Sequence, residues 1–374
     1  MVSGWQLYNV QRIRLKKQTK KVDSKLFFII LLLLTLGLIA VADASAPQAL
    51  NLFNDKYYFV KQQLLWGGIG IISLLVASRL NYTFWEKIAT PLFWISVLAL
   101  ILVLIPGLGT KVLGARRWLF LGNLSFQPSE LAKLTIAIYL AKLSTKEKHL
   151  MAFVIPMAAV AGLIMLQPDL GTTIVTVGIA LSQIFYSGVN LLHFAGIGVL
   201  GGVTGVLYIL SSAYRRARFL TFLNQSQDPL GRDYHIRQIL LALGSGGILG
   251  AGLGQSRQKY LFLPEAATDS IFAIIAEEVG FIGSIILIFI FAAFVFRAFK
   301  VAQEAPDKFS QTLALGITTW IGGQAFLNIA SMVALTPLTG IPLPFFSYGG
   351  NSLVMILLAC GILLNISRYG HGKK

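Results

Sequence analysis

Asp269 is the acidic residue whose sequence surroundings most favour chemistry, because it lies where a long basic stretch meets an apolar run. A helix that includes it would place Ala273, Ala276 and Gly280 on the same face, and such small residues leave space for a bulky ligand. A carboxylate in that position could act as a general base. The alternative role is a helix N-cap, to which Thr268 is equally suited.

The stretch 213–269 that precedes this apolar run is rich in basic residues. Guanidinium and ammonium groups in such a stretch are suited to binding phosphate, so we predict a phosphate-bearing ligand. The alternative is that Arg215, Arg216 and Arg218 extend toward lipid headgroups. The basic residues of the stretch, set against four acids, are Arg215, Arg216, Arg218, Arg232, Arg237, Arg257 and Lys259.

Other acids lie within or beside apolar runs, where an ionised group needs a partner. Glu130 and Lys133 are three residues apart at a predicted helix start, so they can pair on one face. A structural ion pair and a substrate contact both remain open for them. We expect Asp169 to be a helix N-cap. Of Glu277 and Glu278, at least one must face a polar cavity or a partner group.

The composition indicates which elements position these groups. The chain has 374 residues, of which 56% are hydrophobic and 12% charged, and its mean hydropathy is +0.73. These values are typical of an all-α polytopic membrane protein. We predict one domain, residues 1–374, with about ten transmembrane helices near 26–48, 62–79, 91–108, 130–143, 150–167, 170–188, 190–212, 270–297, 310–336 and 345–366.

An even number of helices places both termini on one side of the membrane. The basic tail 1–25 and the basic C-terminus predict that this side is cytoplasmic. The stretch 213–269 then becomes a large extracellular loop between the seventh and eighth helices, so its positive charge opposes the usual insertion preference. We therefore expect the net charge of +16 to favour binding of anionic lipids and lipid-linked substrates. We predict no nucleic acid partner.

The apolar segment 239–254 is too short and too rich in glycine to cross a bilayer. We expect a re-entrant or surface-lying helix whose glycines allow close packing, and no phosphate-binding loop. The sequence has no metal-binding cluster and no nucleophile motif. Its four histidines are scattered, and we predict surface or packing roles for them.

Seven segments spread over nearly the whole chain have a distinctive sequence, and they are 114–118, 125–133, 167–172, 214–218, 252–259, 263–269 and 339–352. Together these segments resemble the SEDS family of membrane glycosyltransferases, the FtsW/RodA/SpoVE family. Within it they are most similar to the FtsW-like members that act in cell division.

The resemblance implies a ten-span fold, polymerisation of lipid II on a growing lipid-linked glycan strand, an essential aspartate that matches Asp269, and a divalent cation, Mg or Mn, with unknown ligands. It also implies a class B penicillin-binding transpeptidase and other divisome membrane proteins as partners. The substrate contacts predicted beside Asp269 are Arg117, Glu130, Lys133, Asp169, Arg215, Arg216, Arg218, Arg257, Lys259, Ser347 and Ser352.

The chain departs from the family pattern beside the predicted catalytic acid. Members often have His-Thr-Asp-Phe where this chain has Ala267-Thr268-Asp269-Ser270. A histidine at position 267 is therefore not available to assist the aspartate.

Glycosidic-bond formation from a lipid pyrophosphate needs a base for the acceptor hydroxyl and positive charge for the leaving group. Asp269 and the loop cations match these needs in a single inverting displacement. Two other functions fit the sequence less well. A lipid II flippase would need access from both faces, and a scaffold for a transpeptidase would leave Asp269 and the arginines without a role.

Overall fold

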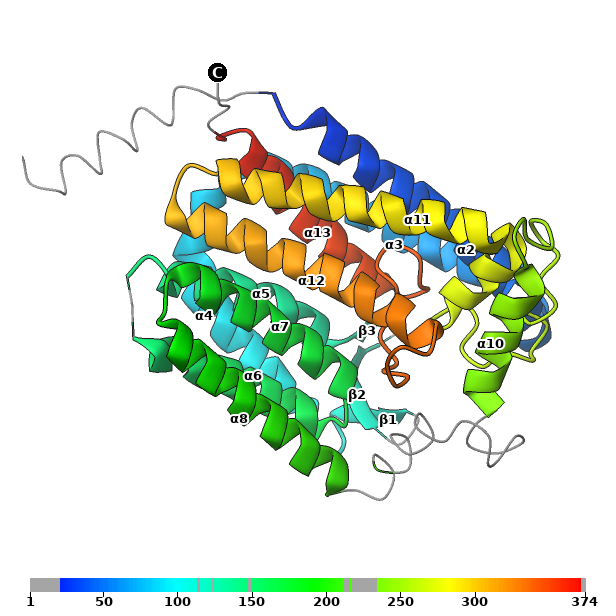
Figure 1. Ribbon diagram of the computed structural model, residues 1–374, viewed down its shortest axis with the longest axis horizontal. Coiled ribbons are helices and arrows are strands. Elements are labelled where there is room, and N and C mark those ends of the chain that lie inside the picture. Colours follow the sequence, from blue (N-terminus) through cyan, green and yellow to red (C-terminus); the bar gives the residue numbers. More distant parts are fainter. Residues whose placement is uncertain are drawn as a thin grey trace, which may run out of the picture.

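The computed structural model describes residues 21–112, 115–122, 124–146, 149–211, 216 and 234–370, and the fold over these ranges is a helical bundle (Figure 1). Its helices are α2 (Ser24–Phe53), α3 (Tyr58–Arg79), α4 (Tyr82–Leu102), α5 (Pro128–Leu143), α6 (Leu150–Leu166), α7 (Leu170–Ser187), α8 (Leu191–Leu210), α10 (Tyr234–Gly246), α11 (Ile271–Glu304), α12 (Lys308–Met332) and α13 (Gly350–Ser367).

The predicted all-α polytopic architecture is confirmed. Among the described residues, seven helices are long and apolar enough to cross a membrane: α2, α3, α4, α7, α11, α12 and α13. Helices α5, α6 and α8 occupy the three remaining positions at which the sequence predicts a span. Large apolar side chains such as Ile72, Trp94 and Phe289 are more than 60% exposed, as expected for a surface that faces lipid.

Helices α5, α12 and α13 form the centre of the bundle, and most of their side chains are buried. Helix α13 packs along α3, whereas α12 packs against α11, α7 and α5. At one end of the bundle, the Asp23 carboxylate pairs with Arg297 at 2.7 Å, and the Ser367 hydroxyl accepts a hydrogen bond from the Asp23 amide. The start of α2 and the end of α13 therefore lie together.

A three-stranded antiparallel sheet between α4 and α5 was not predicted. It consists of β1 (Gly109–Val112), β2 (Ala115–Leu121) and β3 (Leu124–Phe126), with β2 in the middle. Short strands in a polar connection contain no long apolar run, so hydropathy does not indicate them. Their backbone hydrogen bonds are made to each other. The sheet places Arg117 at the opposite end of the bundle from Asp23.

The predicted re-entrant segment is a helix, α10, followed by a turn that packs into a break in α11. It begins earlier than expected, at Tyr234. Gly280 in α11 has φ 68° and ψ −168°, a conformation that only glycine adopts readily. Across the break, the amides of Ala251 and Gly252 donate to the carbonyls of Glu277 and Glu278. The turn thus satisfies backbone groups that the break leaves without helical partners.

Close packing of the glycines is confirmed at this break. A β-carbon on Gly250 would lie 2.1 Å from the Glu278 carbonyl oxygen, and one on Gly246 would lie 2.4 Å from that of Ala276. Helix α10 lies beside α11 at the end of the bundle where α2 ends and α11 begins (Figure 1).

Candidate active site

Asp269 precedes α11 and is not part of it, so the predicted helix face with Ala273 and Ala276 is wrong. Helix α11 begins at Ile271, and its N-cap is Ser270. The amides of Thr268 and Ser270 both donate to the Glu265 carbonyl, at 3.1 and 3.0 Å. This turn ends the basic stretch before the helix starts, and the N-cap roles considered for Asp269 and Thr268 are also wrong.

The half-buried Asp269 is held in place through three successive backbone carbonyls. The Tyr348 amide donates to Ala267 at 2.8 Å, the Ser347 hydroxyl donates to Thr268 at 2.6 Å, and the Asn328 side-chain amide donates to Asp269 at 2.8 Å. Since each donor belongs to α12 or to the 340–349 loop, the C-terminal part of the chain fixes the position of this acid.

The 340–349 loop, residues Gly340–Gly349, is itself cross-linked by the same groups. Asn328 also donates to the Ile341 carbonyl at 2.7 Å, and Ser347 Oγ also accepts from the Leu343 amide at 2.7 Å. Gly340 has φ 68°, and a β-carbon there would lie 3.3 Å from Asp269 Oδ2. The carboxylate therefore lies directly against this glycine.

Glu130 and Lys133 form the predicted pair, with Nζ and Oε1 2.7 Å apart and both side chains almost fully buried. Lys133 also donates to Gln324 Oε1 at 2.9 Å. Gln324 in turn donates to the Pro342 carbonyl at 2.9 Å, and Trp320 donates to Gln324 at 3.0 Å. The pair is thus connected to the same loop that lies against Asp269.

Asp169 is the N-cap of α7, as predicted, and accepts from the Thr172 amide at 3.0 Å. Arg117 on β2 lies beside it, with Nε 3.8 Å from the Asp169 carboxylate. Its guanidinium also donates to the carbonyls of Gln167 and Pro168. These contacts fasten the sheet to the turn between α6 and α7, and contact of either residue with substrate remains a prediction.

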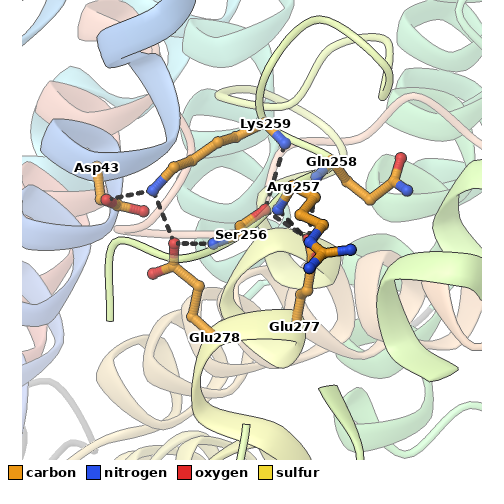
Figure 2. A network of polar contacts seen from close by, with 7 residues as sticks. All are labelled: Asp43, Ser256, Arg257, Gln258, Lys259, Glu277 and Glu278. Carbon is orange, nitrogen blue, oxygen red and sulfur yellow. Dashed lines mark hydrogen bonds and ion pairs between the residues drawn. The ribbon is translucent and has the colours of Figure 1, made fainter. Parts of the chain in front are cut away.

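Glu277 and Glu278 both face partner groups (Figure 2). The prediction that at least one of them does so is confirmed. Glu277 accepts hydrogen bonds from the Ser256 hydroxyl and from the amides of Arg257 and Gln258. Glu278 accepts from the Ser256 amide at 3.2 Å. Two acids of α11 therefore bind the loop of residues 256–259, which follows the turn after α10 in the sequence.

Lys259 lies between two carboxylates (Figure 2). Its Nζ is 2.7 Å from Asp43 on α2 and 2.8 Å from Glu278 on α11, and its side chain is 4% exposed. Burial alone would lower the pKa of Lys259, but hydrogen bonds to the two acids outweigh it and raise the pKa above its ordinary value. The charged ammonium therefore joins α2, α11 and the loop.

The remaining predicted contacts lie only in part within the described residues. Arg257 and Arg216 are exposed, and Ser352 is half-buried in the first turn of α13. Arg215 and Arg218 lie outside the described residues, as does Arg232. The structure brings Asp269 and Ser347 together, and separately Arg117 and Asp169. It also links Glu130 and Lys133 to the 340–349 loop.

Sequence reasoning missed three side-chain amides that organise the site. Asn328 and Gln324 are described above, and Gln63 on α3 donates to the Ser347 carbonyl at 3.3 Å. All three are at least 99% buried. Uncharged amides inside apolar runs were the available signal, because a buried amide also needs partners.

A polytopic membrane bundle with an acid whose backbone is held by the C-terminal part of the chain defines the class of protein: an integral membrane protein with a polar site at one end of its helices. The family model described as "Cell cycle protein", for FtsW, RodA and SpoVE, matches residues 24–372. The chain belongs to this family.

Curated relatives match over nearly the whole chain. It is 44% identical to stage V sporulation protein E of Bacillus subtilis, over 94% of this chain and 99% of that protein. It is 39% identical to the probable peptidoglycan glycosyltransferase FtsW of Trichlorobacter lovleyi, over 92% and 93% of the two chains.

Two solved structures have the same fold. One belongs to a study of the structural coordination of polymerisation and crosslinking by a peptidoglycan synthase complex. It has a TM-score of 0.78 at 28% identity and covers 94% of this chain and 99% of its own. The other is the rod shape determining protein RodA of Thermus thermophilus, with a TM-score of 0.70 at 27% identity, covering 94% and 98%.

Proposed function

We propose that this chain is a peptidoglycan glycosyltransferase that polymerises lipid II into glycan strands during cell division and releases undecaprenyl pyrophosphate. Its membership of the FtsW/RodA/SpoVE family supports this activity, as do the names of several relatives at 36–39% identity. The observation that carries the proposal is the half-buried Asp269, whose backbone is fixed by Asn328, Ser347 and Tyr348.

In this mechanism Asp269 is the general base. It accepts the proton of an acceptor hydroxyl while that oxygen forms a bond to the anomeric carbon of the donor. The bond from this carbon to the pyrophosphate breaks in the same step, so the configuration inverts. Fixing the backbone on both sides of the acid keeps its carboxylate in a constant position, which favours such a displacement.

Positive charge is needed for the departing pyrophosphate. We assign this role to the exposed Arg257 and Arg216, together with Arg215 and Arg218. Lys259 is a weaker candidate than the sequence implied, because its ammonium is buried between Asp43 and Glu278. In this proposal Lys259 holds the loop that carries Arg257.

A divalent cation remains a proposal without a defined site. Among the described residues, no group of three or more His, Cys, Asp or Glu side chains could hold a metal ion. Mg²⁺ is often held by one or two carboxylates and the phosphates of a substrate, and a bound pyrophosphate would provide the phosphates. The mechanism above uses no step that depends on it.

We further propose that the Asp269 end of the bundle faces the outside of the bacterial cytoplasmic membrane and that both termini are cytoplasmic. A class B penicillin-binding transpeptidase and other divisome membrane proteins are the proposed partners. The fold shared with a chain from a peptidoglycan synthase complex supports a crosslinking partner.

The test is strand synthesis by the purified protein from lipid II, with and without the transpeptidase. Asp269→Asn removes the base but keeps the size of the side chain, so we expect synthesis to fall by at least about a hundredfold with thermal stability unchanged. Asp55→Asn, at an acid in the α2–α3 connection, is the control and should retain activity. An Asp269→Asn protein that makes strands at a rate near wild type would disprove the assignment.

A further inference from the structure

Helix α10 contacts the residue that immediately follows Asp269. His235 Nε2 lies 2.9 Å from the Ser270 hydroxyl oxygen. Ser270 is fully buried and is the N-cap of α11, yet its side chain does not cap the helix. Its hydroxyl is instead directed to a histidine 35 residues earlier in the sequence.

The residue before His235 holds the other end of the same segment. The Tyr234 hydroxyl donates to the Phe262 carbonyl at 2.8 Å. The first turn of α10 therefore contacts the following chain at two points, Phe262 and Ser270. Between these two contacts the segment carries Asp269, and its opposite side is bound by α12 and the 340–349 loop.

The side chains around Asp269 leave His235 as the imidazole that binds this turn. Ala267 is buried and cannot hydrogen-bond through its side chain. Ser270 carries the hydroxyl that His235 contacts.

We propose that His235 is a positioning residue for Asp269, acting through its hydrogen bond to Ser270. The bond fixes the turn before α11, and so it fixes the backbone that carries the carboxylate. The inference rests on the proposed glycosyltransferase function. His235 is not assigned a step in proton transfer.

The experiment compares His235→Leu, His235→Gln, Ser270→Ala and the His235→Leu/Ser270→Ala double variant in strand synthesis. We expect His235→Leu and Ser270→Ala each to lower kcat by about tenfold, since small displacements of a catalytic group reduce rates strongly, while KM for lipid II stays within about twofold. The double variant should be no slower than either single variant, because both remove the same bond.

His235→Gln should restore most of the rate, because glutamine Nε2 can occupy the position of the imidazole Nε2. Gln238→Leu, on the same helix and half-buried, is the control for a general change to α10 and should keep kcat. A glutamine variant as slow as the leucine variant, or losses that add in the double variant, would overturn the inference.

Amide hydrogen exchange tests the contact between His235 and Ser270 independently of enzymatic activity. In His235→Leu we expect faster exchange over residues 263–274, with α12 unchanged and with His235→Gln close to wild type. If the wild-type protein makes no strands, the proposed function fails, whereas the exchange experiment still tests the contact. Unchanged exchange in His235→Leu would overturn the positioning role.

Discussion

Glu130 and Lys133 show, at the scale of single residues, how a buried charge is accommodated in this bundle. Lys133 has two hydrogen-bonding partners, Glu130 and Gln324, and its ammonium lies 5.1 Å from the centre of the Trp320 ring. The second carboxylate oxygen of Glu130 is buried without a hydrogen-bonding partner among the described residues. The lysine is therefore the better satisfied member of the pair.

We predict that Lys133→Met is more damaging than replacing both residues. The single change leaves the Glu130 charge buried and unpaired, which should cost about 3–5 kcal/mol of stability, whereas Lys133→Met/Glu130→Gln removes both charges. Thermal unfolding in detergent measures the difference. A folded but inactive double variant would favour substrate contact, and a double variant with full activity would rule it out.

At the scale of elements, the break in α11 determines how the turn after α10 packs against this helix. It allows the turn after α10 to form backbone hydrogen bonds with α11, and it brings Glu277 and Glu278 to the loop of residues 256–259. The segment that carries Asp269 follows this loop in the sequence. The break consequently determines where the segment with Asp269 begins.

We predict that Gly280→Ala destabilises the protein by about 2 kcal/mol or more, because a side chain is strained at φ 68° and its β-carbon would lie 2.2 Å from the Gly250 amide nitrogen. Gly178→Ala in α7 is the matched control, since a β-carbon there meets no atom within 4 Å. It should be neutral or slightly stabilising. Equal unfolding temperatures for the two variants would contradict this role for the break.

Lys259 connects α2, α11 and the loop of residues 256–259. We therefore expect its role to be structural. We predict that Lys259→Met lowers the thermal stability because it leaves Asp43 and Glu278 without their shared cation. Lys61→Met, which removes an exposed lysine paired with Asp55, is the control and should have little effect. A Lys259→Met protein of normal stability that binds lipid II weakly would return Lys259 to the substrate contacts.

The whole molecule has two polar ends that differ in their chemistry. One end joins the start of α2 to the end of α13 through Asp23, Arg297 and Ser367. The other contains Asp269, the sheet and the 340–349 loop. The proposed orientation places the first end in the cytoplasm and the second outside.

Single introduced cysteines can test this orientation, because the native Cys360 is fully buried. Lys56, between α2 and α3, and Lys146, after α5, are both exposed. We predict that Lys56→Cys reacts with a membrane-impermeant maleimide in intact cells, whereas Lys146→Cys reacts only after the membrane is permeabilised. The reverse pattern would overturn the orientation, and labelling of the parent protein would invalidate Cys360 as a silent background.

The sequence by itself determined the positions of the helices at the ten predicted spans, seven of which are long and apolar enough to cross a membrane among the described residues. It also determined the pairing of Glu130 with Lys133 and the N-cap at Asp169. These features depend on residues close together along the chain, so hydropathy and helical spacing indicate them. Only the tertiary structure decided that Asp269 precedes α11, that Lys259 is buried between Asp43 and Glu278, and that His235 reaches Ser270. Each of these depends on contacts between distant segments, and a sequence pattern of short period carries no information about such contacts.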